Sequence, residues 1–460
     1  MVEDWKITKT IARMPGYSPK TSADLTKLAS SRDLAGISQI RYAHDPVPKL
    51  PRYIKDIPQR FPETRFEQNA AVLQNGVRLF PREAHLPFRC TIGGAFESRY
   101  WRASLDASLK MLKLISEDRS ASDIEVNSGI TLARLATREL RPGIEDRFNR
   151  ATTYMYPLGS KERIELLAAM MVMQFLFDDK CEQTSDHTLA PFVSDFRARL
   201  EKESTQPEDS QLQQHISGVL RGIRAQDRIK GNGGEEVINT MRKAFQRRRP
   251  EGEFATIREY LEFRHDNVGA QFVLASVKFS IGSDVDLSDP RLETFLTLVK
   301  DHLSIVNDLA SFDKEDRAFK SGADKEIINI VDVVRQLLSL SDDDAKVLAY
   351  TIQLQTEESM RDELDRLISR DELTASHWHY LHALFISAAG NAFYSMISSR
   401  YGGEPARIPA AESKKRKASV QLPSPRTMRG GFGMSWVREE CDENHEIWVD
   451  RNAIKVAESC

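Results

Sequence analysis

The sequence has 460 residues, of which 40% are apolar and 29% are charged, and this mix excludes a wholly disordered or fibrous chain. Lys and Arg total 65 against 68 Asp and Glu, which gives a formal net charge of −3. A chain so nearly balanced has no general basic field for nucleic acid or an anionic membrane.

The cysteines and the N-terminus bear on the cellular setting. Four cysteines in a chain of this length form neither a disulfide framework nor a C-x-x-C zinc pattern. The opening residues, MVEDWKITKT, lack the apolar run of a signal peptide. The most apolar stretch, Ile164 to Phe177, is shorter than the ~18 residues of a membrane span. We therefore expect a soluble, cytoplasmic protein with no integral membrane segment and no nucleic-acid partner.

Composition divides the chain into three parts. Residues 1–82 contain many prolines, among them five within HDPVPKLPRYIKDIPQRFP, and are predicted to form an irregular arm packed on the body. In residues 83–403 prolines are sparse and apolar residues recur at three- and four-residue steps, which predicts an all-α domain. Residues 404–460 are rich in Gly, Pro, Ser, Lys and Arg, and are predicted to form a flexible basic tail.

The first cluster of carboxylates ends a helical stripe in SKERIELLAAMMVMQFLFDDKCEQ. One face of an amphipathic helix would carry Ile164, Ala168, Met171, Phe175, Asp178 and Glu182, with Asp179 beside them. Interior carboxylates need a cationic partner, because burying them unpaired is costly. That partner is either a basic side chain in an ion pair or a divalent metal such as Mg²⁺.

A second polar cluster lies in LVKDHLSIVNDLASFDKEDR. A single helical face would carry Leu296, Val299, Leu303, Asn307, Ser311 and Glu315. The last three present an amide, a hydroxyl and a carboxylate at successive turns, all hard oxygen ligands that suit Mg²⁺. The alternative is a solvated polar end of the helix, but this explains poorly why the oxygen ligands continue an apolar stripe.

These two clusters resemble the metal-binding motifs of class I terpene synthases, in particular fungal-type single-domain sesquiterpene synthases. The segment from Asp178 to Glu182 resembles the D-D-x-x-[DE] motif, and the segment from Asn307 to Glu315 resembles N-D-x-x-S-x-x-K-E without a gap. Arg264, shortly before Gly269, resembles the family's diphosphate-sensing arginine. The pair Arg400-Tyr401 resembles the C-terminal R-Y pair.

The resemblance implies an all-α helical barrel with a deep apolar pocket flanked by the two metal-binding helices. It implies three Mg²⁺ ions, with Mn²⁺ as a substitute. The implied metal ligands are Asp178, Asp179, Glu182, Asn307, Ser311 and Glu315. The implied diphosphate-binding residues are Arg264, Lys314, Arg400 and Tyr401. The catalytic residues, by the same resemblance, are Asp178, Asn307, Ser311, Glu315 and Arg264.

The activity so implied is metal-dependent ionisation of a prenyl diphosphate, most simply the C15 farnesyl diphosphate, and cyclisation of the resulting cation. The alternatives are a C20 substrate, an isoprenyl chain-elongating transferase and a non-catalytic helical scaffold. The resemblance is compatible with a homodimer. The candidate pocket aromatics Phe88, Phe175 and Phe177 have plain core packing as their alternative. The histidines of HWHYLH are predicted to be core or surface residues rather than a metal site.

Overall fold

The computed structural model describes most residues between 27 and 409, together with two short strands beyond them. Inside that stretch it leaves undescribed 31, 34–35, 52–53, 55–71, 124, 128–129, 141–147, 182–197, 201–205, 207–208, 228–230, 245–249, 251 and 323–325. The chain divides into two compact units, Met1–Ala410 and Ala411–Cys460. The second unit contains the antiparallel strands β5 (Trp436–Arg438) and β6 (Trp448–Asp450).

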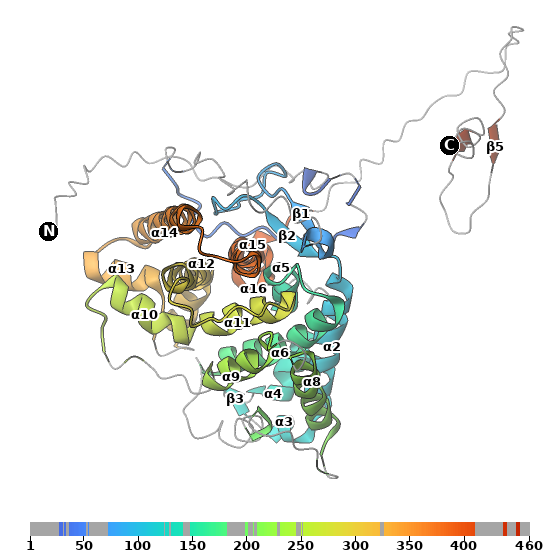
Figure 1. Cartoon of the computed structure of the whole chain (residues 1–460). Coiled ribbons are helices and arrows are strands. Elements are labelled where there is room, and N and C mark those ends of the chain that lie inside the picture. Colours follow the sequence, from blue (N-terminus) through green and yellow to red (C-terminus); the bar gives the residue numbers. More distant parts are fainter. Residues whose placement is uncertain are drawn as a thin grey trace, which may run out of the picture. The chain divides into compact units, whose positions relative to one another are not determined.

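The first unit is built mainly of helices, as the sequence predicts, and Figure 1 shows them packed around one another. Among the described residues, its helices begin with α2 (Trp101–Glu117), α3 (Arg119–Asp123), α4 (Leu132–Glu139), α5 (Ala151–Met155), α6 (Lys161–Cys181) and α8 (Gln211–Asp227). They are followed by α9 (Gly234–Ala244), α10 (Ile257–Asn267), α11 (Ala270–Ile281), α12 (Glu293–Lys320), α13 (Ile330–Leu338), α14 (Asp342–Arg370), α15 (Ala375–Ile397) and α16 (Ser399–Gly402).

Short strands and turns accompany the helices. Antiparallel pairs are formed by β1 (Gly76–Leu79) with β2 (Ala95–Ser98) and by β3 (Glu125–Asn127) with β4 (Ile130–Thr131). Single 3₁₀ turns are η3 (Val72–Asn75), η5 (Phe148–Arg150) and η6 (Glu404–Ala406). In the described part of the chain, no helix combines the length and the apolarity that a membrane crossing requires.

Helix α6 differs from the amphipathic helix that the sequence stripe predicts. Its apolar stripe is buried at Ile164, Ala168 and Met171, but residues 167–173 are buried without interruption, which covers every face of the helix. A helix with 3.6 residues per turn is buried on all sides only when neighbours surround it. Helices α2, α8, α11 and α5 pack against α6 and supply those neighbours.

Helix α12 is the packing centre of the second half of the unit. It contacts α14, α15, α13, α10, α11 and α16, and Figure 1 shows it next to α14 and α15. Local signals set the ends of its partners. Thr256 caps α10 by accepting a hydrogen bond from the Glu259 amide at 3.1 Å. Gly269, with a φ of +76°, breaks the chain between α10 and α11 in a conformation that favours glycine.

Candidate active site

The buried side of α12 begins with apolar residues and ends with the three oxygen donors predicted from the sequence. Along this side lie Leu296, Val299, Leu303, Asn307, Ser311 and Glu315. Ser311 is 4% exposed, whereas Asn307 and Glu315 are partly buried. The helix therefore presents an amide, a hydroxyl and a carboxylate at successive turns toward the interior, a donor set that fits a hard divalent cation.

Arg264 of α10 faces the start of this row. Its Nη2 donates to Asn307 Oδ1 at 3.1 Å, and its Nε donates to Asp308 Oδ1 at 2.9 Å. Nη1 donates to Asn267 Oδ1 on the same helix. The side chain is almost fully buried. These contacts hold a permanently charged guanidinium, whose planar donors suit diphosphate oxygens, beside the predicted metal ligands.

Asp308 ties three helices together at this point, a role that the sequence alone did not reveal. The carboxylate is fully buried and accepts hydrogen bonds from the Tyr260 hydroxyl and from the Ile330 amide at 2.9 Å, besides the Arg264 guanidinium. Burial raises the pKa of Asp308, and the charge of Arg264 opposes that rise. Helices α10, α12 and α13 are thus joined through one carboxylate.

Asn329, the N-cap of α13, is the site residue that sequence reasoning missed. Its Nδ2 lies 2.8 Å from the Asp308 carbonyl oxygen, 2.9 Å from Glu315 Oε2 and 3.4 Å from Ser311 Oγ. Its Oδ1 accepts a hydrogen bond from the Val331 amide at 2.9 Å. The sequence signal was an asparagine before an apolar run, which marks a helix start but not a contact with predicted metal ligands.

The electrostatics of Glu315 follow from this environment. Burial raises the pKa of the Glu315 carboxyl; the charge of Arg264 lowers it and that of Asp308 raises it. Hydrogen bonds from Ser311 and Asn329 favour its ionised form. A divalent cation binds the ionised form of a carboxylate, so these two hydrogen bonds favour the form that a metal would bind.

The C-terminal pair Arg400-Tyr401 lies next to both predicted metal helices. Asn307 Nδ2 donates to the Tyr401 hydroxyl oxygen at 3.3 Å, and Tyr401 is 3% exposed. The Arg400 guanidinium carbon is 5.5 Å from the centre of the Phe175 ring on α6. The α16 turn therefore contacts α12 through Tyr401 and α6 through Arg400.

The aspartates of the first motif fall on the last turn of α6. Asp178 and Asp179 belong to this helix, one turn after Phe175, but their side chains lie outside the described residues, as does the whole of Glu182. Lys314 is partly buried on α12 beside Glu315. The roles predicted for Asp178, Asp179, Glu182 and Lys314, like those of the other site residues, stay predictions.

The predicted pocket aromatics differ in their surroundings. Phe88 is 3% exposed and packs edge to face against Phe393, with ring centres 6.3 Å apart, which is ordinary core packing. Phe175, in contrast, contacts both Arg400 and Tyr394 at the end of α6 that leads to the aspartates. Phe177 has no described side chain.

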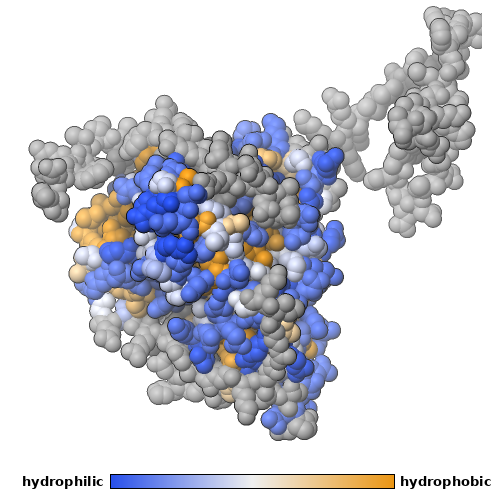
Figure 2. All heavy atoms as spheres, viewed as in Figure 1, coloured by the Kyte–Doolittle hydropathy of each residue, from blue (hydrophilic) through white to orange (hydrophobic). Residues whose placement is uncertain are grey.

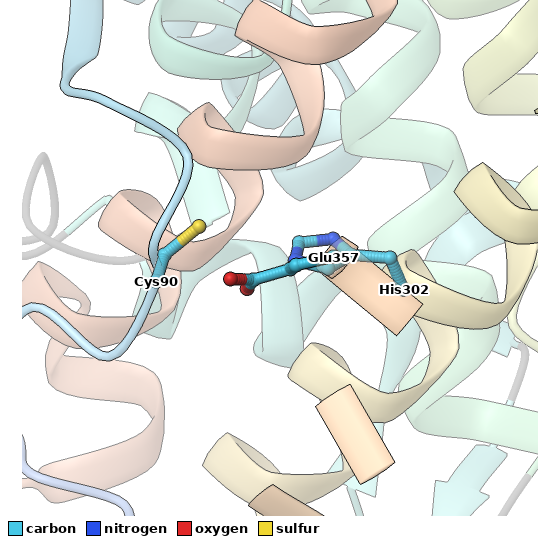
Figure 3. A group of neighbouring side chains, drawn as sticks. All are labelled: Cys90, His302 and Glu357. Carbon is cyan, nitrogen blue, oxygen red and sulfur yellow. The ribbon is translucent and has the colours of Figure 1, made fainter. Parts of the chain in front are cut away.

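A second group of buried polar side chains is formed by residues of α12, α14 and the segment before β2 (Figure 3). Cys90, His302 and Glu357 have potential metal-ligand atoms within 4.8 Å of one another. Both oxygens of Glu357 are already hydrogen-bonded: Oε1 to His302 Nε2 at 3.0 Å and to Gln353 Nε2 at 2.8 Å, and Oε2 to the Thr91 amide at 2.7 Å. This network joins α12 to α14 and to the segment before β2.

Comparison with known proteins places these observations in one family. The model of terpene synthase family 2, C-terminal metal binding, matches residues 156–357, which include α6, α10 and α12. Terpene cyclase 6 of Gibberella fujikuroi is 24% identical over 331 residues, which cover 70% of this chain and 84% of the relative. Aristolochene synthase of Penicillium roqueforti is 25% identical over 278 residues, which cover 57% of this chain and 78% of the relative.

The fold is shared with a solved structure. The crystal structure of aristolochene synthase from Penicillium roqueforti superposes with a TM-score of 0.50 and 19% identity, over 65% of this chain and 95% of that one. The sequence-based prediction of an all-α fold is thereby confirmed. The family predicted from the sequence is the one whose model matches residues 156–357.

Proposed function

Since the chain belongs to terpene synthase family 2 and is a class I terpene cyclase acting on a prenyl diphosphate, we propose that it cyclises farnesyl diphosphate to a sesquiterpene. Sesquiterpene-type relatives, the aristolochene synthases, support the C15 chain length. The product is a hydrocarbon if the last cation loses a proton and an alcohol if it captures water. A C20 diphosphate is the alternative substrate.

The observation that carries the proposed site is the meeting of Arg264, Tyr401 and the oxygen row of α12 at Asn307. We assign Mg²⁺ to two sets of ligands. One set is Asn307, Ser311 and Glu315 on α12, and the other is Asp178, Asp179 and Glu182 at the end of α6. Bound Mg²⁺ supplies Lewis acidity that stabilises negative charge on the departing diphosphate.

In the first step the chain's own residues neutralise charge on the diphosphate, donate a hydrogen bond to it and protect the cation that remains. The allylic C–O bond breaks, and the diphosphate leaves with the electron pair. Arg264, Lys314 and Arg400 neutralise that charge, and the Tyr401 hydroxyl donates a hydrogen bond to a diphosphate oxygen. Because Arg264 is already held by Asp308 and Asn307, it needs little reorganisation when the charge develops.

The remaining task is to protect the cation. Water would quench an allylic cation, so the hydrocarbon chain must lie in an apolar cavity. The face of Phe175 is suited to stabilise positive charge close to the site of ionisation, by about 1–2 kcal/mol if the ring is desolvated.

The chain-length assignment is tested by offering farnesyl diphosphate and geranylgeranyl diphosphate together in equal amounts with Mg²⁺, and identifying the extracted products by mass spectrometry. A cyclic C15 product in large excess is expected. A cyclic C20 product in excess would replace the sesquiterpene assignment with a diterpene one. In a parallel reaction supplied with isopentenyl diphosphate, an elongated diphosphate would contradict both.

A further inference from the structure

A strap formed by residues 41–47 lies against the segment that follows α16. The Ala43 amide donates to the Ala406 carbonyl oxygen at 2.8 Å, and the Ile408 amide donates to the Arg41 carbonyl oxygen at 2.8 Å. Between these two bonds, Tyr42 pairs with Arg407 in an antiparallel bridge. Residues at the two ends of the first unit are therefore joined directly beside the Arg400-Tyr401 turn.

Side chains reinforce this pairing. Tyr42 is 4% exposed, and the Arg407 guanidinium lies over its ring, 4.7 Å from the ring centre. The Tyr42 hydroxyl donates to Glu404 Oε1 at 3.2 Å and accepts from Arg407 Nη2. The strap is also tied to α15, because the His44 amide donates to the Met396 carbonyl oxygen at 2.6 Å.

The same strap continues to the metal-binding helix. Val47 is 1% exposed and belongs to the apolar cluster that contains Leu309 and Phe312 of α12. The His44 ring is half-buried. Burial lowers the pKa of His44, and the negative charge of Asp313 on α12 opposes that change more than any other charged group does. Next to His44, Asp45 accepts a hydrogen bond from Arg89 Nε at 2.9 Å. This bond attaches the strap to the segment before β2.

We propose that residues 41–47 are a positioning element of the diphosphate site, which hold α16 and its Tyr401 against the Asn307 end of the α12 row. This inference rests on the proposed function of Arg400 and Tyr401. The strap acts through the 3.3 Å contact between Asn307 and Tyr401, which joins the two helices that it spans.

Gly402 offers a way to move the strap without altering a site side chain. A Cβ at this position would lie 2.4 Å from Ala406 Cβ and 2.9 Å from His44 Cβ, so Gly402→Ala must push the strap and the 404–406 turn away from α16. Gly218→Ala in α8 is the matched control, because a Cβ there meets nothing within 4 Å. Ala43→Pro is a second variant, since it removes the amide that donates to Ala406.

The readout is the dissociation constant of inorganic pyrophosphate in the presence of Mg²⁺, measured by calorimetry on the full chain, together with the thermal midpoint. Residues that hold a ligand-binding group in place typically change affinity by about 10- to 100-fold when they are lost. We expect Gly402→Ala and Ala43→Pro to weaken pyrophosphate binding by at least about tenfold, and Gly218→Ala to bind as the wild type does.

The outcomes separate the two proposals. A wild-type protein that binds no pyrophosphate with Mg²⁺ would contradict the diphosphate site and, with it, the role of the strap. Wild-type affinity in folded Gly402→Ala and Ala43→Pro would overturn the strap proposal alone, because a purely structural strap would lower the thermal midpoint and leave the affinity unchanged. If one variant fails to fold, the other decides.

Discussion

Asn329 offers the sharpest test of how the oxygen row on α12 is held. Its amide group has two separable functions. Oδ1 caps α13 by accepting from the Val331 amide, and Nδ2 donates toward Glu315 Oε2 and Ser311 Oγ. Asn329→Ser keeps a good N-cap acceptor and removes the Nδ2 donor, whereas Asn329→Ala removes both.

The expected magnitudes follow from these contacts. A hydrogen bond to a charged group contributes about 1.5–3 kcal/mol, which corresponds to roughly 10- to 100-fold in a dissociation constant. Both variants should therefore raise the Mg²⁺ concentration for half-maximal activity by about 10- to 100-fold. Losing the cap costs about 1 kcal/mol of folding free energy, so the alanine variant should also be less stable than the serine variant by about that amount.

The assay combines Mg²⁺ titration of diphosphate release with urea unfolding of the same preparations. The serine and alanine variants should share one Mg²⁺ requirement and differ in unfolding free energy. An unchanged Mg²⁺ requirement in both variants would refute the view that Asn329 orders the metal ligands. A defect in the alanine variant alone would show that only the cap matters.

Three further predictions concern other parts of the chain. Asp178→Asn should abolish turnover while leaving the circular-dichroism spectrum intact; substantial turnover would remove Asp178 from the metal ligands. Ending the chain after Ala410 should preserve the pyrophosphate affinity, whereas ending it after Gly403 removes the strap's partner and should weaken that affinity at least about tenfold; equal affinities would contradict this. Burial, with the nearby His379, lowers the pKa of His382 in the folded protein to about 4, whereas its ordinary value is 6.5. Between pH 4 and pH 6.5, His382 is therefore protonated in the unfolded chain and neutral in the folded one. Stability should therefore fall by about 2 kcal/mol from pH 7 to pH 5 through this residue, and His382→Gln should flatten that part of the urea-unfolding profile; an unaltered slope would be inconsistent with a buried neutral imidazole.

Local periodicity was enough to predict the oxygen row. Asn307, Ser311 and Glu315 are four residues apart on one continuous helix, so their shared face follows from 3.6 residues per turn. The same reasoning misjudged α6, because a stripe describes one face and does not show that neighbours cover the others. Burial on every face is a property of the surrounding helices, which the sequence of α6 does not contain.

The residues that hold the site in place could not be predicted in this way. Asn329 reaches the row from the start of α13, and the sequence does not show how the loop after α12 brings the start of that helix back to the row. Asp308 lies one residue from Asn307, on a neighbouring face, and the positions of Tyr260, Arg264 and Ile330 give it a role. The strap is the extreme case, since it pairs residue 43 with residue 406, a contact that no local pattern encodes.

Release of diphosphate from farnesyl diphosphate, measured with Mg²⁺ and again with the metal removed by EDTA, tests the central claim most directly. The account predicts release and a cyclic C15 product that depend on Mg²⁺ and return when Mg²⁺ is added back. Release at the same rate in EDTA would contradict the assignment of the α6 and α12 oxygen ligands to a metal-dependent ionisation.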